Sequence, residues 1–435
     1  MSDAPEDIEI ENATAYPPSI QAGIPKLGQT PKGWTRYFLG DLLRRVVRPA
    51  KLRDAEAYQL VTAKRSRGGI VARETLRGDQ IKTKTQFYVE GGDFLISNRQ
   101  VSHGACGIVP ESLHCAVVSN EYTAFRTSPK LDLAFLNALS HSVYFQQTCF
   151  HSSIGVHVEK LVFRLEDWMG WEFDVPPLDE QRRIVAVLET WDRAIAETEQ
   201  LIDAKRRRWR LLVGELRQNR WKPVALGKLG RWVGGGTPSK VVNDYWQNGD
   251  IPWVSPKDMT EWQVSSSEDT ITARAVRESA TQLLPAGSVL VVTRSGILRT
   301  KVPVAVATRP VSFNQDIKAL VMSDVRFGSI IAALIHAEAD RLRRATVKTG
   351  TTVESIDLDG LKAFQLRVPE GVREVDIAHS VVVGGLQEID GLEKQLDRLR
   401  TQRRGLMQKL LTGGWRLDAR FDPVVAVSLL AVRGA

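Results

Sequence analysis

Apolar residues recur with a helical period along one long stretch in the middle of the chain. Between Leu178 and Arg217 they are spaced alternately four and three residues apart, which is the repeat of a coiled-coil seam. No proline interrupts this stretch and its first glycine is Gly214, so the pattern predicts one helix of about 50–60 Å at 1.5 Å per residue. The predicted seam positions are Ile184, Leu188, Trp191, Ile195, Thr198, Ile202, Lys205, Trp209, Leu212 and Leu216. A helix of this length cannot bury its own apolar stripe, so the pattern also predicts a partner helix.

The same seam recurs 194 residues further along the chain. Its positions there are Ala378, Val382, Gly385, Ile389, Leu392, Leu396, Leu399, Arg403, Leu406 and Leu410. Both stretches follow a Val-Pro pair, and each is followed at the same offset by a tryptophan, Trp221 or Trp415. An internal repeat that keeps its register over ten seam positions favours two helices that pair with each other over two unrelated amphipathic helices.

The sequence before each helix is also repeated, as a mixed domain of β-rich and irregular segments. GWTRYFLGDLL at Gly33–Leu43 matches RWKPVALGKLG at Arg220–Gly230, and GDFLISNR at Gly92–Arg99 matches GSVLVVTR at Gly287–Arg294. We therefore expect six segments: a flexible acidic lead-in (1–32), a first domain (33–175), a central helix (176–220), a second domain (221–369), a distal helix (370–413) and a tail (414–435). The fold class predicted is α+β, with two related mixed domains and two long helices.

Between the repeated segments the two domains diverge, and the divergent loops mix cations with aromatic residues. Loops carry recognition while frameworks carry packing, so this pattern is typical of two related domains that recognise two different things. Lys, Arg and aromatic side chains in loops suit contacts to phosphates and base edges of nucleic acid. The candidates are Lys64, Arg65, Arg67, Arg73, Arg77, Lys82, Lys84 and Tyr88 in the first domain, and Lys240, Tyr245, Trp246, Trp253, Lys257, Arg299 and Lys301 in the second.

Two further candidates, Arg99 and Arg294, each end an equivalent strand where the chain enters a loop. We expect both to lie near a nucleic acid. The alternative is that each arginine bridges its domain to its own helix.

Composition agrees with an acidic partner and gives no sign of catalysis. With 59 Lys and Arg against 51 Asp and Glu, the net charge is +8. The seven histidines and three cysteines show no metal-ligand spacing, and no nucleophile elbow or dinucleotide motif is present. GGGTPS near Gly235 is expected to be a surface turn. An N-terminus without a basic region and the absence of a long apolar run predict a soluble, cytoplasmic protein outside the membrane.

These motifs together resemble the specificity subunit of type I restriction–modification systems, over the chain from about Gly33 to Gly414. The most specific matches are VPPLDEQRRIVAVLE (Val175–Glu189), GGTPSKVVNDYWQNGDIPWVSPKDM (Gly235–Met259) and LMQKLLTG (Leu406–Gly413). The resemblance implies a non-catalytic subunit with two target recognition domains, each of which reads half of a bipartite site on double-stranded DNA. The helices would form an antiparallel spacer whose outer faces hold two methyltransferase subunits.

By the same resemblance, this chain needs no cofactor. The methyltransferase partners would bind S-adenosylmethionine and methylate adenine, and restriction subunits would add ATP- and Mg-dependent translocation and cleavage. The distal helix departs from the family, because VPEGVREVDIAHSVV (Val368–Val382) lacks the PPLxEQ signature, and we expect a weaker methyltransferase dock there.

An antiparallel pair also predicts a register for the seam. Aligning the two stripes end to end pairs Ile184 with Leu410, Leu188 with Leu406, Trp191 with Arg403, Ile195 with Leu399, Thr198 with Leu396, Ile202 with Leu392, Lys205 with Ile389, Trp209 with Gly385, Leu212 with Val382 and Leu216 with Ala378. In this register a large ring faces a glycine, and the Arg403 guanidinium can stack on Trp191. A slip of one heptad would place Trp209 opposite Leu392 or Ala378.

Two other classes of function stay open at this point. One is a coiled-coil assembly scaffold whose domains bind protein, and the other is an enzyme with an unrecognised site. Steep salt dependence of binding to duplex DNA would favour the recognition subunit over the scaffold.

Overall fold

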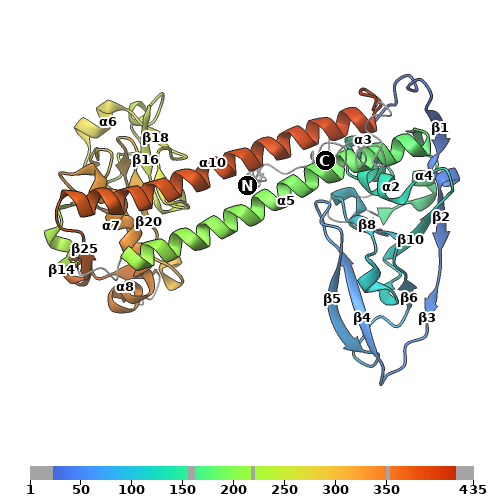
Figure 1. The fold of residues 1–435 in the computed structure, drawn as a ribbon, viewed down its shortest axis with the longest axis horizontal. Helices are drawn as coiled ribbons and strands as arrows, with labels where there is room; N and C mark the ends of the chain where they lie inside the picture. The colour runs from blue at the N-terminus through green and yellow to red at the C-terminus, as the bar shows by residue number, and fades with distance from the viewer. Residues whose placement is uncertain (1–22, 155–161, 217–220, 349–352, 418–435) are drawn as a thin grey trace, which may run out of the picture. The chain divides into compact units, whose positions relative to one another are not determined.

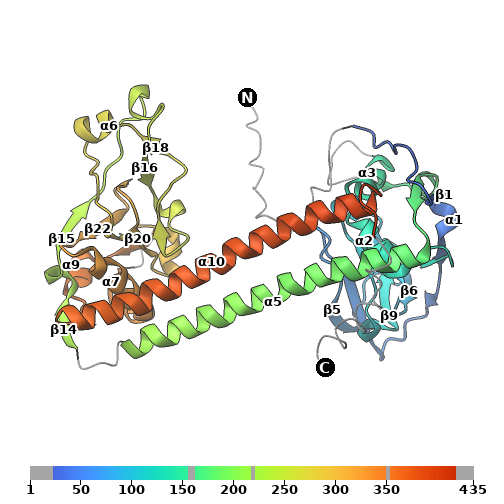
Figure 2. The ribbon, with the colours of Figure 1, turned by 45° about the horizontal axis from the view of Figure 1, so that its top comes forward.

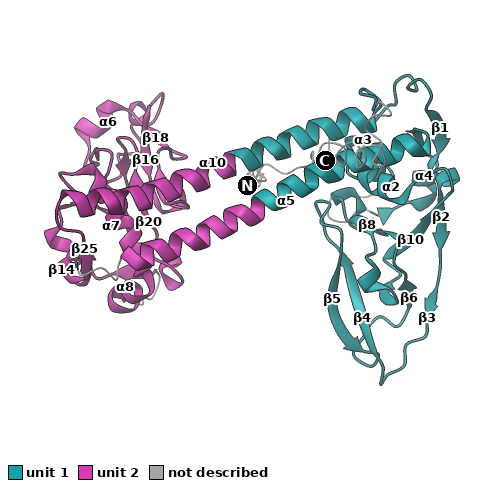
Figure 3. Cartoon of the chain, viewed as in Figure 1, with its two compact units in different colours: residues 1–198, 395–435 teal, residues 199–394 magenta. Residues whose placement is uncertain are grey.

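The computed structural model describes residues 23–154, 162–216, 221–348 and 353–417 (Figure 1). The chain divides into two compact units, Met1–Thr198 with Gln395–Ala435 and Glu199–Lys394 (Figure 3). The boundaries fall inside the two long helices, α5 (Leu178–Leu216) and α10 (Val372–Leu411). Each unit therefore holds one mixed domain together with one end of the helix pair.

The described part of the first unit contains four small sheets. β1 (Thr35–Phe38) pairs with β13 (Glu172–Val175) at the entrance to α5. A four-stranded sheet has the order β2 (Leu43–Val46), β10 (Tyr122–Thr127), β7 (Phe94–Ser97), β8 (Cys106–Ile108). A five-stranded sheet has the order β3 (Pro49–Ala50), β6 (Gln86–Val89), β9 (Ala116–Ser119), β4 (Ala57–Ala63), β5 (Ile70–Arg77). A short pair joins β11 (Ser153–Ile154) to β12 (Val162–Phe163).

Helices cover the four-stranded sheet of the first unit. They are α1 (Leu39–Leu42), α2 (Leu133–Ser140), α3 (Val143–His151) and α4 (Leu165–Met169), with short 3-10 turns η1 (Val101–His103) and η2 (Glu111–Leu113). Their core is aromatic: Trp168 meets Phe125 and Phe145 edge to face. The same core contains Ile184 and Leu188 of α5 and Met407 and Leu410 of α10, so burial of apolar surface joins the helix ends to the domain.

The second unit has a related sheet with different additions. β14 (Lys222–Ala225) pairs with β25 (Gln365–Val368). A five-stranded sheet has the order β15 (Arg231–Gly234), β22 (Ile317–Val321), β19 (Val289–Val292), β20 (Val304–Ala307), β17 (Gln263–Val264), and a three-stranded sheet has β18 (Thr270–Ile271), β16 (Ile251–Val254), β21 (Ser312–Phe313). The remaining elements are β23 (Val347–Lys348) with β24 (Ser355–Ile356), the helices α6 (Ala273–Glu278), α7 (Val325–Ala337), α8 (Ala339–Thr346) and α9 (Leu358–Ala363), and the 3-10 turns η4 (Leu226–Lys228), η5 (Asn243–Tyr245), η6 (Pro256–Asp258) and η7 (Gly296–Arg299).

The two domains share a framework, as the repeated sequence segments predict. The order β2-β10-β7-β8 in the first unit corresponds to β15-β22-β19-β20 in the second. GDFLISNR forms β7 and GSVLVVTR forms β19, at the same place in the two sheets. Trp34 and Trp221 are both buried at the start of their domains. The sheets added outside this framework differ between the two domains. Because the framework is shared and a long helix follows each domain, the predicted fold class of two related mixed domains is confirmed.

Within each unit, the segments of α5 and α10 lie side by side and run antiparallel (Figures 1 and 2). Ion pairs cross between them at Asp192–Arg403 in the first unit, and at Lys205–Glu388 and Arg206–Glu393 in the second. In the second unit Arg206 pairs with Glu393 and Trp209 packs against Gly385, so the position of the partner along α10 falls as the residue number along α5 rises.

The predicted register is confirmed at Trp209. A Cβ atom added at Gly385 would lie 2.2 Å from Cδ1 of Trp209, so the indole occupies the space that a side chain would need. The Trp209 Nε1 also donates to the carbonyl oxygen of Val382 at 3.0 Å. Heptad slips that place Trp209 opposite Leu392 or Ala378 are excluded.

The seam departs from the prediction at its ends and at Arg403. Leu212 and Leu406 are only half-buried, while their neighbours Val213 and Met407 are fully buried, because the domains cover an adjacent face of each helix. Arg403 is 2% exposed, and its guanidinium binds both carboxylate oxygens of Asp192 at 2.9 and 3.0 Å. No periodic pattern in the sequence points to this acidic partner. Stacking of Arg403 on Trp191 stays a prediction.

The close approach of Trp209 to Gly385 predicts that a methyl group there destabilises the second unit. Gly385→Ala should lower the free energy of unfolding by about 1–3 kcal/mol, the usual cost of overpacking, and the loss should largely disappear in a Trp209→Ala background.

Gly384 provides a matched control on the same helix. A Cβ there has no heavy atom within 4 Å, so Gly384→Ala should be neutral or stabilise by up to about 1 kcal/mol through helix propensity. Denaturant unfolding measures all four variants. Equal effects at both glycines would contradict the packing.

A second prediction concerns His141, which follows α2 and is 8% exposed. Burial lowers the pKa of His141 to about 3, and the charges of Arg403 and Arg67 act in the same direction. The unfolded chain, where a histidine titrates near 6.5, therefore binds more protons than the folded chain between these two values. Stability should be fully present above about pH 6.5 and fall on acidification by about 1.4 kcal/mol per pH unit from this residue.

Denaturant midpoints between pH 7 and 5 test this behaviour. His141→Gln should remove part of the pH dependence, whereas His114→Gln, at an exposed site in the same domain, should leave it unchanged. An identical pH profile for the His141 variant and the parent would rule out this assignment.

Candidate nucleic-acid interface

The first domain brings several of the predicted contact residues to the β4–β5 hairpin and the loop that follows it. Lys64 and Arg65 are exposed at the turn between these strands, and Arg73 is exposed on β5. The hairpin and the next loop border a hollow of about 370 Å³, whose lining includes Arg73, Lys82, Gln80, Gln86 and Tyr122. Cationic, amide and phenolic groups thus line one hollow, where they can bind phosphates and base edges.

Three of the predicted contact residues of the first domain, Arg73, Arg77 and Lys84, already have partners within the protein. The Arg73 guanidinium lies 2.6 Å from the Glu74 carboxylate, and the Lys84 ammonium donates to the carbonyl oxygen of Gly78 at 2.7 Å. A phosphate would have to compete with these interactions. Arg77 pairs in the same way with Asp79 at 3.4 Å, and Tyr88 is half-buried.

Arg67 is a correction to the predicted set of exposed contacts. It is 8% exposed and has φ near 60°, and its backbone N–H donates to the carbonyl oxygen of Gly104. Its charge helps to lower the pKa of His141, which places the guanidinium near the buried end of α2. The left-handed turn at Ser66 and Arg67 directs this side chain inward, and sequence pattern alone gives no signal for that.

Arg99 and Arg294 both leave the end of a framework strand, as predicted, and both are exposed. Arg99 pairs with Glu121 at 2.7 Å, a residue of the turn between β9 and β10. The Arg294 backbone N–H donates to the Asp316 carbonyl oxygen, at the start of the neighbouring strand β22. In the described part of the chain neither side chain makes a hydrogen bond or ion pair with a long helix, so nothing supports the alternative of a bridge to the helix.

In the second domain, aromatic and charged groups gather around η5 and α6. Lys240 lies over the Trp246 ring at 5.9 Å, and Arg274 lies over the Tyr245 ring at 6.0 Å. Glu278 accepts from Tyr245 and Arg274, and its pKa is lowered mainly by the hydrogen bond from Arg274. Trp253 is instead a core residue, 6% exposed, whose indole N–H donates to the carbonyl oxygen of Gly236.

The GGGTPS segment is a tightly packed loop. A Cβ at Gly235 would lie 2.1 Å from the carbonyl oxygen of Asn314, and one at Gly236 would lie 2.8 Å from the backbone of Ala280. The segment is irregular and partly buried at Gly236 and Pro238 rather than the predicted surface turn. The glycines are required because neighbouring chain segments approach so closely.

The exposed cations of both domains fall into two groups, those that form an ion pair with a carboxylate and those that do not. Lys257 is held by Glu268 and Asp269, and Arg299 by Glu354. Six predicted contacts are exposed and have no carboxylate at ion-pair distance within the described ranges: Lys64, Arg65, Lys82, Lys240, Arg294 and Lys301. Such cations are the best suited to bind a polyanion, because they exchange only water and counterions for a phosphate.

The EQ of the PPLxEQ signature is buried rather than presented to a partner. Glu180 is 3% exposed and accepts hydrogen bonds from Arg416, at 2.6 Å to each oxygen, and from Trp34. Gln181 is fully buried; its amide donates to the carbonyl oxygens of Lys130 and Pro176 and accepts from the Asp132 N–H. These residues fasten α5 to the first domain.

The corresponding residues of the distal helix are Glu374 and Val375. Glu374 is exposed and accepts only from the backbone of Glu370 in its own turn, while Val375 is buried. The missing signature therefore changes how the second domain is fastened to its helix. The weaker methyltransferase dock expected at the distal helix stays a prediction.

The described ranges contain neither a metal site nor a membrane-spanning helix. No group of three or more His, Cys, Asp or Glu side chains is placed to hold a metal ion. None of the described helices combines the length and the apolar character that crossing a membrane requires.

Comparison with known proteins adds independent information. The chain is 37% identical over 235 residues to the specificity subunit of the type I restriction enzyme EcoR124I/EcoR124II from Escherichia coli, a match that covers 51% of this chain and 58% of that protein. It is 27% identical over 161 residues to the MjaIX specificity subunit of Methanocaldococcus jannaschii, over 36% of each protein. These matches span about half or less of the relatives' own lengths.

Solved structures share the fold at low sequence identity. One comes from work on complex assembly and conformational transition of the type I R-M system, with a TM-score of 0.59 and 17% identity over 89% of this chain and 98% of the other. Another is the type I S subunit from M. genitalium, with a TM-score of 0.52 and 13% identity over 90% and 98%.

A family model described as the type I restriction modification DNA specificity domain matches residues 31–204 and again 218–382. The two matches cover most of the chain and coincide with its internal repeat. The chain therefore belongs to the family of type I restriction modification DNA specificity domains.

Proposed function

We propose that this chain is the DNA-recognition subunit of a type I restriction–modification complex. Each domain reads one half of a bipartite site on double-stranded DNA, and the chain itself carries out no catalysis. The observation that carries the proposal is the duplicated framework with divergent, cation-bearing loops, in a chain of this family. A repeated scaffold places two readers, and the differences between their loops make the two half-sites different.

The partners follow from the family. Two methyltransferase subunits dock on the helix pair, bind S-adenosylmethionine and methylate the site, and restriction subunits complete the complex in the cytoplasm. Their cofactors, ATP and Mg among them, belong to those partners. The helix pair supports this role because its outer faces carry charged and polar side chains that the seam does not use.

The two-reader model predicts what happens when one domain is exchanged. Residues 33–175 replaced by the first domain of another specificity subunit should change one half of the methylated sequence and leave the other half intact. Profiling of adenine methylation in a host that carries the chain with its methyltransferase measures both halves. A change in both halves, or in neither, would refute the model.

A point substitution tests the cation assignment. Arg294→Ala should weaken binding to the cognate duplex, and should either reduce the salt slope by about one unit, for a lost phosphate contact, or relax one base position at about 1–3 kcal/mol. Fluorescence anisotropy at several salt concentrations measures both effects.

Lys257→Ala is the matched control, because Glu268 and Asp269 already neutralise this exposed cation. It should change affinity and salt slope less. Salt-independent binding by the parent chain would instead favour an assembly scaffold whose domains bind protein.

A further inference from the structure

An aromatic junction joins the second domain to the helix pair. Trp209 of α5, buried over Gly385, meets the edge of Trp262 with ring centroids 4.4 Å apart and an interplanar angle of 89°. Trp262 in turn stacks on His336, with centroids 3.6 Å apart and an angle of 23°. Three rings thus form one continuous contact within the second unit.

The rings come from both sides of the junction. Trp262 directly precedes β17, and its carbonyl oxygen accepts from the Val306 N–H of β20 at 2.9 Å. His336 lies near the end of α7, and its ring makes a hydrogen bond with the backbone of Val304 in β20. Trp262 and His336 are therefore held by the edge of the domain's main sheet, whereas Trp209 and Gly385 belong to the helix pair.

The His336 ring stacks in its neutral form. Burial lowers the pKa of His336 to about 4, and the nearby charge of Lys301 acts in the same direction. At neutral pH the stack therefore bears no charge of its own.

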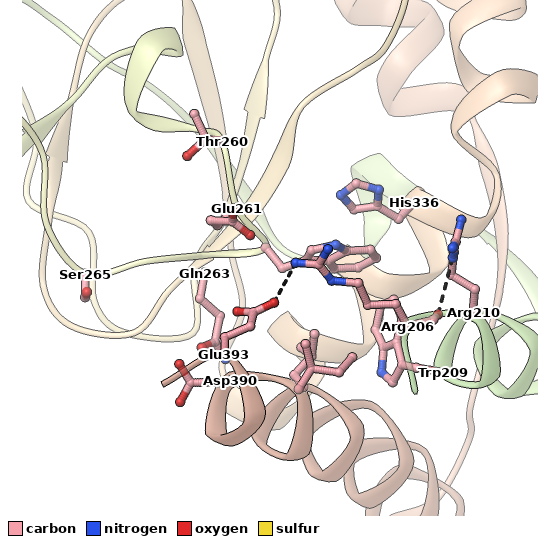
Figure 4. A pocket seen from close by; sticks show the side chains of 13 residues that line it. Arg206, Trp209, Arg210, Thr260, Glu261, Gln263, Ser265, His336, Asp390 and Glu393 are labelled. Atoms are coloured by element: carbon pink, nitrogen blue, oxygen red, sulfur yellow. Dashed lines mark hydrogen bonds and ion pairs between the residues drawn. The ribbon is translucent and has the colours of Figure 1, made fainter. Parts of the chain in front are cut away.

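A hollow of about 630 Å³ lies beside the junction. Its lining includes Trp209, Trp262, His336, Arg206, Glu261 and Glu393. The ion pair between Arg206 and Glu393 borders the hollow and connects the two helices (Figure 4). On the rim of this hollow, the Trp262 ring is a contact of the domain edge with Trp209 of α5.

In the first unit, polar contacts join α5 to its domain. The buried Gln181 makes three hydrogen bonds there, and Glu180 forms an ion pair with Arg416. The distal helix has Glu374 and Val375 at those positions, so it lacks the polar contacts that Glu180 and Gln181 make. Among the described residues, its end makes the surface ion pair Arg326–Asp376, of a type that contributes little, and buries Val375 where the first helix has Gln181. The aromatic junction adds a further apolar contact between the second domain and the helix pair.

We propose that Trp262 is a positioning residue that holds the second recognition domain in one orientation on the helix pair, and so limits the spacer length between half-sites that the complex accepts. This inference rests on the proposed function. Trp262 contacts the helix pair through Trp209, while the exposed cations around η5 and α6 lie on other segments of the domain. Its loss should alter spacing without altering which bases are read.

The test uses the full chain assembled with its methyltransferase. Duplexes carry both half-sites with spacers of the normal length, one base pair shorter or one longer, and methyl transfer from labelled S-adenosylmethionine is measured on each. Trp262→Ala should lower the preference for the normal spacer by about three- to tenfold, the factor that corresponds to an aromatic contact. Trp262→Phe, which keeps a ring, should recover most of the preference, and half-site sequences should stay unchanged.

Trp232→Ala is the matched control, because the Trp232 indole N–H donates to the carbonyl oxygen of Leu226 inside the domain framework. It should keep the spacer preference. The preference is a ratio between duplexes, so a smaller folded fraction of any variant cancels out. An unchanged ratio for Trp262→Ala, or an equal loss for Trp232→Ala, would overturn the inference. Failure of the parent complex to methylate any bipartite duplex would refute the proposed function instead.

Discussion

The packing of Trp209 against Gly385 sets the register of the helix pair, and the rest of the structure depends on that register. A seam repeated every 3.5 residues can slip by a heptad at small cost unless one layer excludes the alternatives. Here a large ring needs a missing side chain opposite it, and Gly385 provides one. Since both domains are built on the ends of the same two helices, a slip would separate each domain from half of its own core. Ile184 with Leu410, for example, would no longer meet in the first unit.

The two ends of the helix pair use different chemistry for the same task. At the first domain, the buried amide of Gln181 satisfies backbone groups that would otherwise be unpaired, and the buried carboxylate of Glu180 pairs with the Arg416 guanidinium. At the second domain, a stack of rings fills the corresponding role through apolar contact. Hydrogen-bonded amides tolerate little displacement, because each lost bond leaves a buried polar group unsatisfied. Stacked rings can slide with a smaller loss, so the identity of Trp262 matters for how tightly the second domain is held.

Loops on this shared framework carry the charges that suit DNA, but exposure alone does not identify the contacts. Arg73, Arg99, Lys257 and Arg299 are as exposed as the unpaired cations, yet each has a carboxylate partner. Transfer of such a side chain to a phosphate exchanges one ion pair for another, so the net gain is small. The unpaired cations are the ones for which phosphate binding is a gain over water.

Periodicity along the chain by itself determined the two long helices, their mutual register and the duplicated framework. These features depend on spacing within one segment, or on comparison of two segments, and both can be read from the residues in order. Only the tertiary structure decided which polar residues face inward. Arg67 is turned into the domain by a left-handed backbone, Glu180 meets Arg416 across 236 residues, and Trp262 meets His336 across 74. Such pairs depend on how elements distant in sequence approach one another, and no local pattern encodes that approach.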